Sequence, residues 1–388
     1  MKLFLLTFFL VYGSAHGYFL LRAWQGLALG RCGAAGLSLW LVAMVVAPVA
    51  VRLLEQDGRE QLARAVAYLG YCWMGFLFLF VALMLLGDLL RFGRYLAAFF
   101  VRVPAVPLFE PRPLFLAVVL LAAGIVVYGW FEAQQVRTVH LVLPTTKLPA
   151  GSPRVRIVQL SDLHVGLIVR DGRVAKVVQA VRQASPDLVV ATGDMVDGHV
   201  GGHFDGVSEL FRGVAPPLGM VAVIGNHEWY AGIGQATAFL QRCGFQLLRN
   251  EQREAGPYLT LVGVDDPATG QPGLSAVEGR LLAAVPRNRF VLLLKHRPEI
   301  AAASRGRFDL QLSGHVHGGQ IFPLTLLTWL RFPVAAGLTR LPERGALYVS
   351  RGCGTWGPPI RFLAPPEVTV IDLVPTSTAS VVRSGRSS

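Results

Sequence analysis

The chain has 388 residues and a net charge of +12, yet only 15% of its residues are charged and 53% are hydrophobic. Soluble proteins carry about a quarter charged residues, so a mean hydropathy of +0.49 argues against a chain that is soluble throughout. The length favours two units. Because the apolar excess gathers before residue 131, the sequence predicts a membrane part followed by a soluble part.

The positive charge comes mostly from arginine. It fits attraction to anionic headgroups or phosphorylated substrates, and an arginine-rich composition explains it equally well. No basic run is interleaved with aromatic residues, so no nucleic-acid partner is expected. The cysteines Cys32, Cys72, Cys243 and Cys353 are far apart and form no CxxC pair, which indicates neither a disulfide framework nor a thiolate metal site.

Four apolar runs are predicted to cross a bilayer, at residues 3–21, 34–51, 66–87 and 114–131. A span needs about 20 mainly apolar residues. None of the runs contains a charged residue, and buried core helices would show a polar face to water. The first run has an alternative as a signal peptide, because Lys2 precedes it and "GSA" lies within it. His16, among small residues in this run, is expected at a helix contact.

The orientation of these spans is predicted from the position of Lys2. The predicted loops on the two sides carry equal numbers of Lys and Arg residues, so the positive-inside rule gives a tie. Lys2 favours a cytoplasmic N-terminus. Four crossings then place the soluble domain on the cytoplasmic side of a multi-pass protein of the cell membrane.

After a connector at residues 132–153, in which an extended strand and a loop are expected, strands and helices alternate. Strands are predicted at residues 154–161, 187–194, 219–226, 258–264, 289–296, 308–315, 345–352 and 367–374, and helices at 173–183, 207–212, 235–242 and 277–284. Strands that are apolar throughout are covered on both faces. The order predicts an α/β domain with more strands than one doubly wound sheet needs, and hence two packed sheets. The polar tail, residues 374–388, is predicted to be disordered.

Several of these strands end in potential metal ligands. The residues concerned are Asp162 and His164, Asp194 and Asp197, Asn226, His227 and Glu228, His296, and His315 and His317. Taken singly, they also fit helix caps, a turn residue or a core histidine. Together they line the carboxyl edge where α/β sheets bind ligands. Oxygen and imidazole ligands without sulfur suit two divalent ions such as Mn, Fe or Zn.

The order DxH, GDxxD, GNHE, H and GHxH resembles the calcineurin-like metallophosphoesterases over residues 154–373. The stretches "SGHVHGGQ" and "YVSRGCGTWGPPIRFLAPPEVTVIDL" are similar to one branch of that family. The branch includes membrane-associated bacterial phosphodiesterases, UDP-2,3-diacylglucosamine hydrolases and an animal transmembrane protein with a metallophosphoesterase domain. The resemblance implies N-terminal transmembrane helices (residues 1–131) followed by a four-layer α/β/β/α sandwich.

The resemblance also implies a ligand set. One metal ion would be held by Asp162, His164, Asp194 and His317, and the other by Asp194, Asn226, His296 and His315, with Asp194 bridging. His315 and His317 would then serve different ions. No ligand position is missing from the chain.

In the implied reaction, a hydroxide that bridges the two ions attacks phosphorus. His227 donates a proton to the leaving oxygen or stabilises its charge, and Asp197 either orients His227 or caps a helix. His199 and His203 follow in a Gly-rich segment that favours a surface loop over substrate contact. Arg351 and Arg361 could bind a substrate phosphate or form structural ion pairs.

Residues 321–334, "IFPLTLLTWLRFPV", directly follow the histidine pair. The segment is too short to span a bilayer. It fits a buried loop or strand pair, or an apolar lip that touches the membrane.

The sequence therefore predicts a hydrolase acting on ester bonds: a membrane-anchored dinuclear phosphoesterase that cleaves a phosphate ester or pyrophosphate, with lipid-linked substrates as one class. One alternative is a phosphatase or phosphodiesterase for soluble nucleotides or phosphoproteins, anchored by its helices. A second is a catalytically silent receptor or scaffold, which missing ligands would mark.

Overall fold

The computed structural model describes residues 2–100, 110–199 and 204–376. The chain divides into two compact units. The helical unit comprises Met1–Phe131 together with Gly357–Phe362, and the sandwich unit comprises Glu132–Trp356 with Leu363–Ser388. His203 and most of the predicted tail lie outside the described residues.

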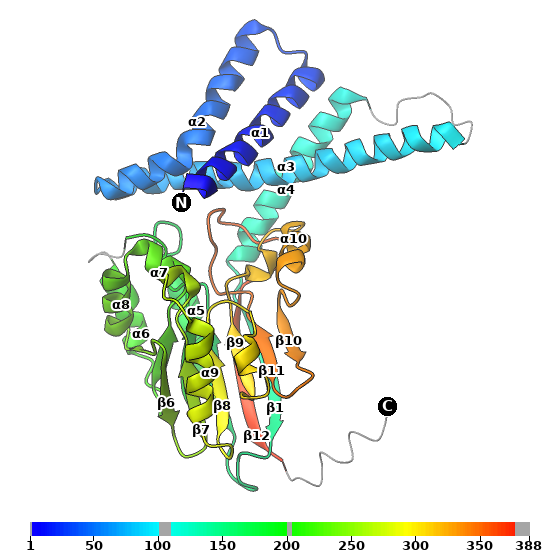
Figure 1. Cartoon of the computed structure of the whole chain (residues 1–388). Coiled ribbons are helices and arrows are strands. Elements are labelled where there is room, and N and C mark those ends of the chain that lie inside the picture. The colour runs from blue at the N-terminus through cyan, green and yellow to red at the C-terminus, as the bar shows by residue number, and fades with distance from the viewer. Residues whose placement is uncertain (1, 101–109, 200–203, 377–388) are drawn as a thin grey trace. The chain divides into compact units, whose positions relative to one another are not determined.

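The helical unit contains α1 (Lys2–Leu27), α2 (Arg31–Gln56), α3 (Glu60–Phe100) and α4 (Pro111–Ala133), which are blue to cyan in Figure 1. Among the described residues, α2, α3 and α4 are long and apolar enough to cross a membrane. They contain the predicted spans at residues 34–51, 66–87 and 114–131. The remaining predicted span, residues 3–21, lies in α1, which is not one of these three helices.

Polar contacts connect α1 with α3 inside the helical unit. His16 Nδ1 donates to the carbonyl of Tyr12 at 2.7 Å and its Nε2 accepts from Trp73 Nε1 at 3.0 Å. Further along α1, Arg22 forms an ion pair with Asp88, to which Tyr18 also donates at 2.6 Å. The predicted role of His16 in a helix contact is therefore confirmed.

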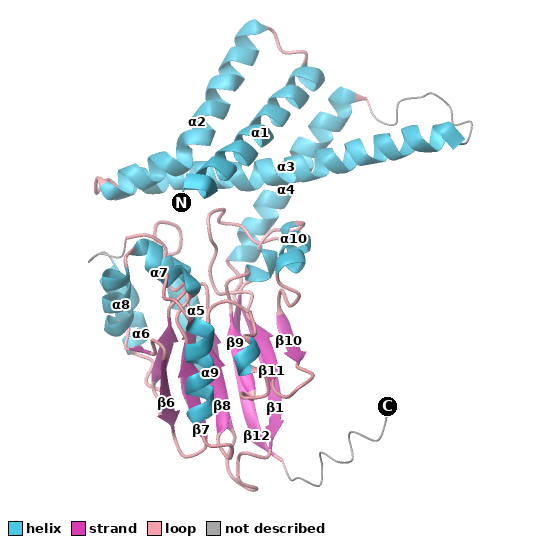
Figure 2. Ribbon diagram, in the orientation of Figure 1, coloured by secondary structure: helices cyan, strands magenta, loops and turns pink. Residues whose placement is uncertain are grey.

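The sandwich unit contains two six-stranded sheets, magenta in Figure 2. In spatial order, the first sheet consists of β1 (Arg137–Thr145), β12 (Glu367–Pro375), β2 (Val155–Leu160), β3 (Leu188–Thr192), β4 (Met220–Val223) and β5 (Gln246–Leu247). The second consists of β10 (Gly337–Arg340), β11 (Ala346–Val349), β9 (Leu310–Ser313), β8 (Phe290–Leu294), β7 (Leu259–Gly263) and β6 (Glu251–Ala255).

All eight predicted strands are present. Three short or exposed strands, β5, β6 and β10, were not predicted. The strand expected in the connector is β1, which pairs in parallel with β12 so that Arg137 lies opposite Glu367. β12 continues to Pro375, beyond the predicted domain end at residue 373.

The two sheets pack face to face, and helices cover their outer faces. Between the sheets, buried side chains such as Ile157 and Leu292 form one core. Helices α5 (Asp171–Ala184), α6 (Asp205–Arg212) and α8 (Ile233–Arg242) cover the first sheet. Helix α9 (Leu274–Ala284) covers the second. The predicted α/β/β/α architecture is confirmed.

Shorter helices lie in the loops of the sandwich unit: α7 (Asn226–Ala231), α10 (Leu324–Arg331), and single turns at η2 (Pro267–Thr269), η3 (Ala302–Ser304) and η4 (His317–Gly319). The residues of α10 belong to the segment 321–334. Because α10 is a helix without any buried residue, the alternative of a buried loop or strand pair is wrong for this part of the segment.

Candidate metal centre

The candidate ligands gather at one edge of the sandwich because their strands run in parallel. β2, β3 and β4 are parallel neighbours in the first sheet, and β7, β8 and β9 are parallel neighbours in the second. Each candidate ligand follows the carboxyl end of one of these strands, so residues far apart in sequence meet at the same edge.

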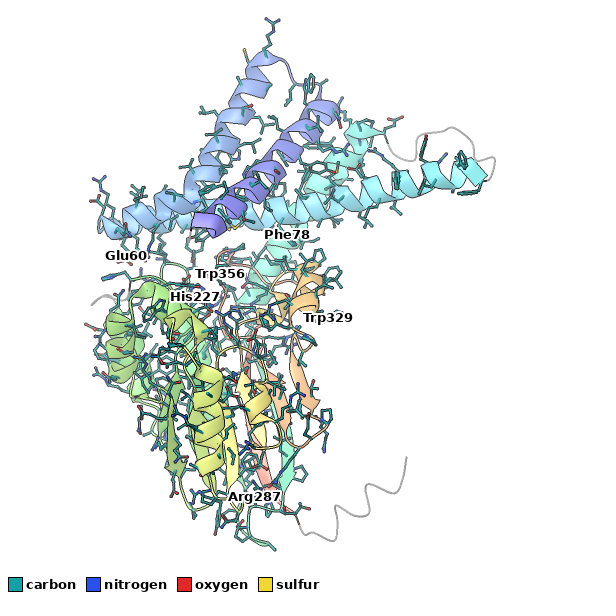
Figure 3. The ribbon with its side chains drawn as sticks, in the orientation of Figure 1. Glu60, Phe78, His227, Arg287, Trp329 and Trp356 are labelled. Carbon is teal, nitrogen blue, oxygen red and sulfur yellow. The ribbon has the colours of Figure 1, made fainter. Side chains whose placement is uncertain are left out.

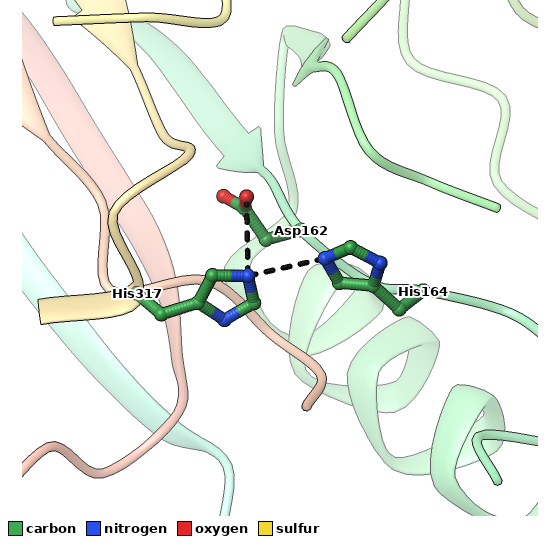
Figure 4. A group of neighbouring side chains, drawn as sticks. All are labelled: Asp162, His164 and His317. Carbon is green, nitrogen blue, oxygen red and sulfur yellow. Dashed lines mark hydrogen bonds and ion pairs between the residues drawn. The ribbon is translucent and has the colours of Figure 1, made fainter. Parts of the chain in front are cut away.

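Asp162, His164 and His317 form the first group that could hold a metal ion (Figure 4). Nε2 of His317 lies 3.1 Å from Nε2 of His164 and 3.5 Å from Oδ1 of Asp162. All three residues are buried. Two imidazole nitrogens that face one another beside a carboxylate are the arrangement expected of neutral ligands pointing at a common ion.

Asp194, His296 and His315 form a second group. Nε2 of His296 lies 2.9 Å from Oδ2 of Asp194 and 3.1 Å from Nδ1 of His315. Nδ1 of His296 lies 2.9 Å from the carbonyl oxygen of Thr192, which fixes the ring so that Nε2 faces the site.

Asp194 also belongs to a third group, with His164 and His227, so its carboxylate lies beside both halves of the site. Oδ2 of Asp194 is 4.0 Å from Nε2 of His164. Asn226 is buried, and its Oδ1 has no hydrogen-bond partner among the described residues. A buried carbonyl oxygen without a partner is costly, and a cation bound there would satisfy it.

The backbone at these residues is unusual. Asp162, His164, Asp194, His315 and His317 all have positive φ angles, between 50° and 73°. A non-glycine residue rarely adopts this conformation, which costs of order 1–3 kcal/mol and persists only where the surrounding structure enforces it. Consequently, His315 and His317 do not continue strand β9, which ends at Ser313, and they point into different groups.

Two glycines leave the room that the carboxylates need. A Cβ atom at Gly314 would collide with Ser161 and the carboxylate of Asp162, and one at Gly225 would collide with the carboxylate of Asp194. These positions require glycine because the backbone passes directly against a candidate ligand.

The electrostatics of the site suit metal binding. Burial lowers the pKa values of His164 and His315 to about 3, so both rings are neutral. Burial also opposes the charged form of His296, but the charge and hydrogen bond of Asp194 outweigh it and raise the pKa to about 10. Burial alone would raise the pKa of Asp194, yet His296 and His227 hold it well below its usual value. A cation bound here would replace the proton between His296 and Asp194, and the oxygen and imidazole donors of the site fit divalent ions.

His227 lies at the rim of the site and contacts Asp197. Its Nδ1 is 3.0 Å from Oδ1 of Asp197, and its ring lies 4.6 Å, centroid to centroid, from that of His164. Burial would lower the pKa of His227, but Asp194 and Asp197 prevail and raise it to about 9. The side chain of His227 is 13% exposed to solvent. A protonated imidazole is thus held beside the ligands with access to solvent.

Glu228 has a role that the sequence did not indicate. Its buried carboxylate accepts hydrogen bonds from four backbone N–H groups, those of Gly225, Asp194, Met195 and Val196, at 2.6–3.1 Å. It thereby fixes the turn after β3 against the start of α7 and so positions Asp194 and Asn226. The pattern "GNHE" matches a capping box at the start of a helix, and this pattern could have predicted the role of Glu228 from the sequence.

The structure shows other contacts for the remaining predicted residues. Arg351 forms an ion pair with the buried Glu367, which also accepts from Tyr348 at 2.7 Å, and this contact supports the structural alternative. Arg361 is fully buried and belongs to the helical unit, where its backbone N–H donates to Gly129 at 3.0 Å. His199 is exposed and joins none of the ligand groups.

Residues 155–319 match the model of the calcineurin-like phosphoesterase family. A protein of Aquifex aeolicus described as an uncharacterized metallophosphoesterase is 38% identical, over 67% of this chain and 98% of its own. The zebrafish transmembrane protein with metallophosphoesterase domain is 32% identical, over 77% of this chain and 70% of its own. The chain belongs to the calcineurin-like metallophosphoesterases and is a hydrolase acting on phosphoester bonds.

Among solved structures, a dimetal phosphatase from Danio rerio is similar, with 13% identity and a TM-score of 0.36 over 52% of this chain and 88% of that one. A 5'-nucleotidase precursor from Thermus thermophilus matches with 16% identity and a TM-score of 0.34, over 57% of this chain and 54% of that one.

Replacing Glu228 with glutamine should loosen the candidate metal centre without removing a ligand. Glu228→Gln substitutes an amide for a carboxylate that accepts four backbone hydrogen bonds. We expect the free energy of unfolding to fall by about 1–3 kcal/mol, together with a lower metal content. Denaturant titration and elemental analysis measure the two effects.

Glu209→Gln, on the exposed face of α6, is the matched control and should change neither property. Wild-type stability and metal content in the Glu228 variant would contradict the positioning role.

Proposed function

We propose that this protein is a membrane-anchored dinuclear metal-dependent phosphoesterase that hydrolyses a phosphate ester or pyrophosphate. The observation that carries the proposal is the pair of ligand groups that share Asp194, one containing His164 and the other containing His296 and His315. A carboxylate shared by two groups of oxygen and imidazole donors suits two adjacent cations.

The proposed ligands are those expected from the sequence. Asp162, His164, Asp194 and His317 would hold one ion, and Asp194, Asn226, His296 and His315 the other. The ions, of the Mn, Fe or Zn type, would supply charge neutralisation at phosphorus and an acidified water. The close approach of these side chains and the unpartnered Oδ1 of Asn226 support this assignment.

His227 is proposed as the general acid. Its raised pKa keeps the ring protonated near neutral pH, and its partial exposure allows contact with a leaving group. Asp197 accepts a hydrogen bond from Nδ1. Nε2 therefore carries the proton that would be donated to the leaving oxygen, with Asp197 orienting the ring.

The helices support anchoring of the chain in a membrane. Three helices long and apolar enough to cross a membrane and relatives named as transmembrane proteins favour a multi-pass anchor. We propose that α1 crosses the membrane as well, so that four crossings from a cytoplasmic N-terminus place the sandwich unit on the cytoplasmic side. The anchor would give the site access to lipid-linked phosphoesters. Soluble nucleotides and phosphoproteins are the competing substrates, and the complete ligand set disfavours a silent scaffold.

A metal-supplemented activity screen of the full chain in detergent tests the proposal. Lipid phosphoesters, pyrophosphate-linked lipids, nucleotides and phosphopeptides would be offered with Mn²⁺, Fe²⁺ or Zn²⁺. Hydrolysis of a lipid phosphoester that stops on chelation is the expected result. Preference for nucleotides would instead support the alternative of soluble substrates.

Asp194→Asn should deplete both ions because the shared carboxylate loses its charge. Protein purified without chelator is expected to carry close to two ions per chain, and the variant far fewer. Elemental analysis measures the content, with Asp205→Asn, an exposed residue of α6, as the control. Stoichiometric metal in the Asp194 variant would refute the shared-carboxylate assignment.

His227→Ala should keep the metals and lower turnover of an ester with a poor leaving group by about 10²- to 10⁴-fold. A nitrophenyl ester, whose leaving group needs little protonation, should be affected less. Asp197→Asn should give a smaller loss because the ring keeps a hydrogen-bonding partner. His140→Ala, on the exposed face of β1, serves as control. Equal rates for His227→Ala and wild type on the poorer ester would remove His227 from the mechanism.

A further inference from the structure

Helix α10 presents large apolar side chains to the surface of the sandwich unit. Leu326, Leu327, Trp329 and Leu330 are all exposed, Leu330 by 84%. None of the residues of α10 is buried. The eight residues of α10 therefore pack no apolar face against the core of the sandwich unit. Their exposed apolar surface indicates a contact with something outside this unit.

The same segment is tied to the metal centre. Oγ1 of Thr325 donates to the carbonyl of Gly318, next to His317, at 3.0 Å. At the other end of α10, the ring of Phe332 lies 5.7 Å from that of His315, edge to face. The helix is therefore attached at both ends to residues that neighbour or contact candidate ligands.

Exposed aromatic residues continue this surface around His227. Tyr230 is 62% exposed with its ring 5.8 Å from that of His227, and Trp356 is 52% exposed with its ring 5.5 Å away. Gln320 connects Trp356 to the segment before α10, donating to its carbonyl at 2.9 Å and accepting from its N–H at 3.0 Å. In Figure 3, His227, Trp356 and Trp329 lie at one end of the sandwich unit and Arg287 at the other.

We infer that α10, Tyr230 and Trp356 form a membrane-docking rim, a surface that inserts into the headgroup region of a bilayer beside the metal centre. Trp, Tyr and Leu on one short helix and its neighbours, with Arg331 at the end of the helix, make up the composition of interfacial segments. A water-facing role would not need this concentration of large apolar side chains.

The rest of the chain favours a lipid bilayer as the partner of this rim. The same polypeptide carries helices long and apolar enough to cross a membrane, so the rim meets a lipid surface at a high effective concentration. The chain also passes from Trp356 directly into Gly357–Phe362, which belongs to the helical unit. Neither a free peptide nor a soluble partner has such a link on this chain.

The inference deepens the proposed function and rests on it for its catalytic consequence. Docking of α10 would hold His317 through Gly318, and docking of Trp356 would hold the ring of His227. A phosphoester of an amphiphile in the bilayer would then reach the site without leaving the headgroup layer. Water-soluble esters would need no such contact.

A lipid-quenching experiment tests the rim directly. The full chain with Cys32→Ser and Cys72→Ser, which leaves the buried Cys243 and Cys353, receives Leu330→Cys or, at the opposite end of the sandwich unit, Arg287→Cys. Both are labelled with an environment-sensitive fluorophore and placed in phosphatidylcholine–phosphatidylglycerol liposomes. We expect a blue shift and quenching by doxyl lipids at position 330 only. Equal signals at both positions would overturn the inference.

An activity experiment separates the rim from catalysis. Leu327→Ser, Trp329→Ser and Leu330→Ser together should lower hydrolysis of a liposomal lipid phosphoester by roughly tenfold or more, since apolar area leaves the interface. Metal content and hydrolysis of a soluble nitrophenyl ester should be unchanged. Leu338→Ser, at a partly exposed residue of β10, is the matched control.

The outcomes distinguish the two proposals. Quenching at position 330 in a protein that hydrolyses no phosphoester would support the rim and reject the proposed function. Full lipid activity in the triple variant, or a change in its oligomeric state without quenching at position 330, would reject the rim. A changed oligomeric state without quenching would instead assign α10 to contact with another copy of the chain.

Discussion

The buried carboxylate of Asp194 is the group on which the rest of the site depends. Its Oδ2 lies 2.9 Å from His296, its Oδ1 accepts the backbone N–H of His227 at 2.8 Å, and its own N–H donates to Glu228. A buried charge without compensation costs several kcal/mol. The first two contacts offset that cost and hold the candidate ligand His296 and the proposed acid His227 beside the carboxylate, whereas the third fixes the backbone of Asp194.

The two-sheet architecture makes this compensation possible. Parallel strands of both sheets end at one edge, so Asp162 and His315, separated by 153 residues, contact one another: the backbone N–H of His315 donates to the carboxylate of Asp162 at 2.9 Å. Five ligand candidates hold left-handed backbone conformations there. That strain is supported by the strands behind it, most of whose side chains are buried, and it fixes the orientation of the candidate ligands.

The apolar surface of the chain has two parts with different physical reasons. The long helices exceed the length that a bilayer core requires. Helix α10 is far too short for that, yet it is equally unable to bury its leucines in the sandwich. A helix of this kind is stable next to an interface, and its ends are attached beside His315 and His317. In the proposed arrangement, the membrane-docking rim and the candidate metal centre therefore adjoin one another within the sandwich unit.

The sequence by itself determined the strands that are buried on both faces, the helices between them, and the ligand types at the strand ends, because these are local patterns of side-chain chemistry. Only the tertiary structure decided which ligands lie together, that Glu228 holds four backbone N–H groups, and that Arg351 pairs with Glu367. It also decided that "LTLLTWLR" is an exposed helix and that Arg361 is buried. Such features depend on contacts between residues distant in the chain, and no local pattern specifies the burial that makes an apolar run core in one place and surface in another.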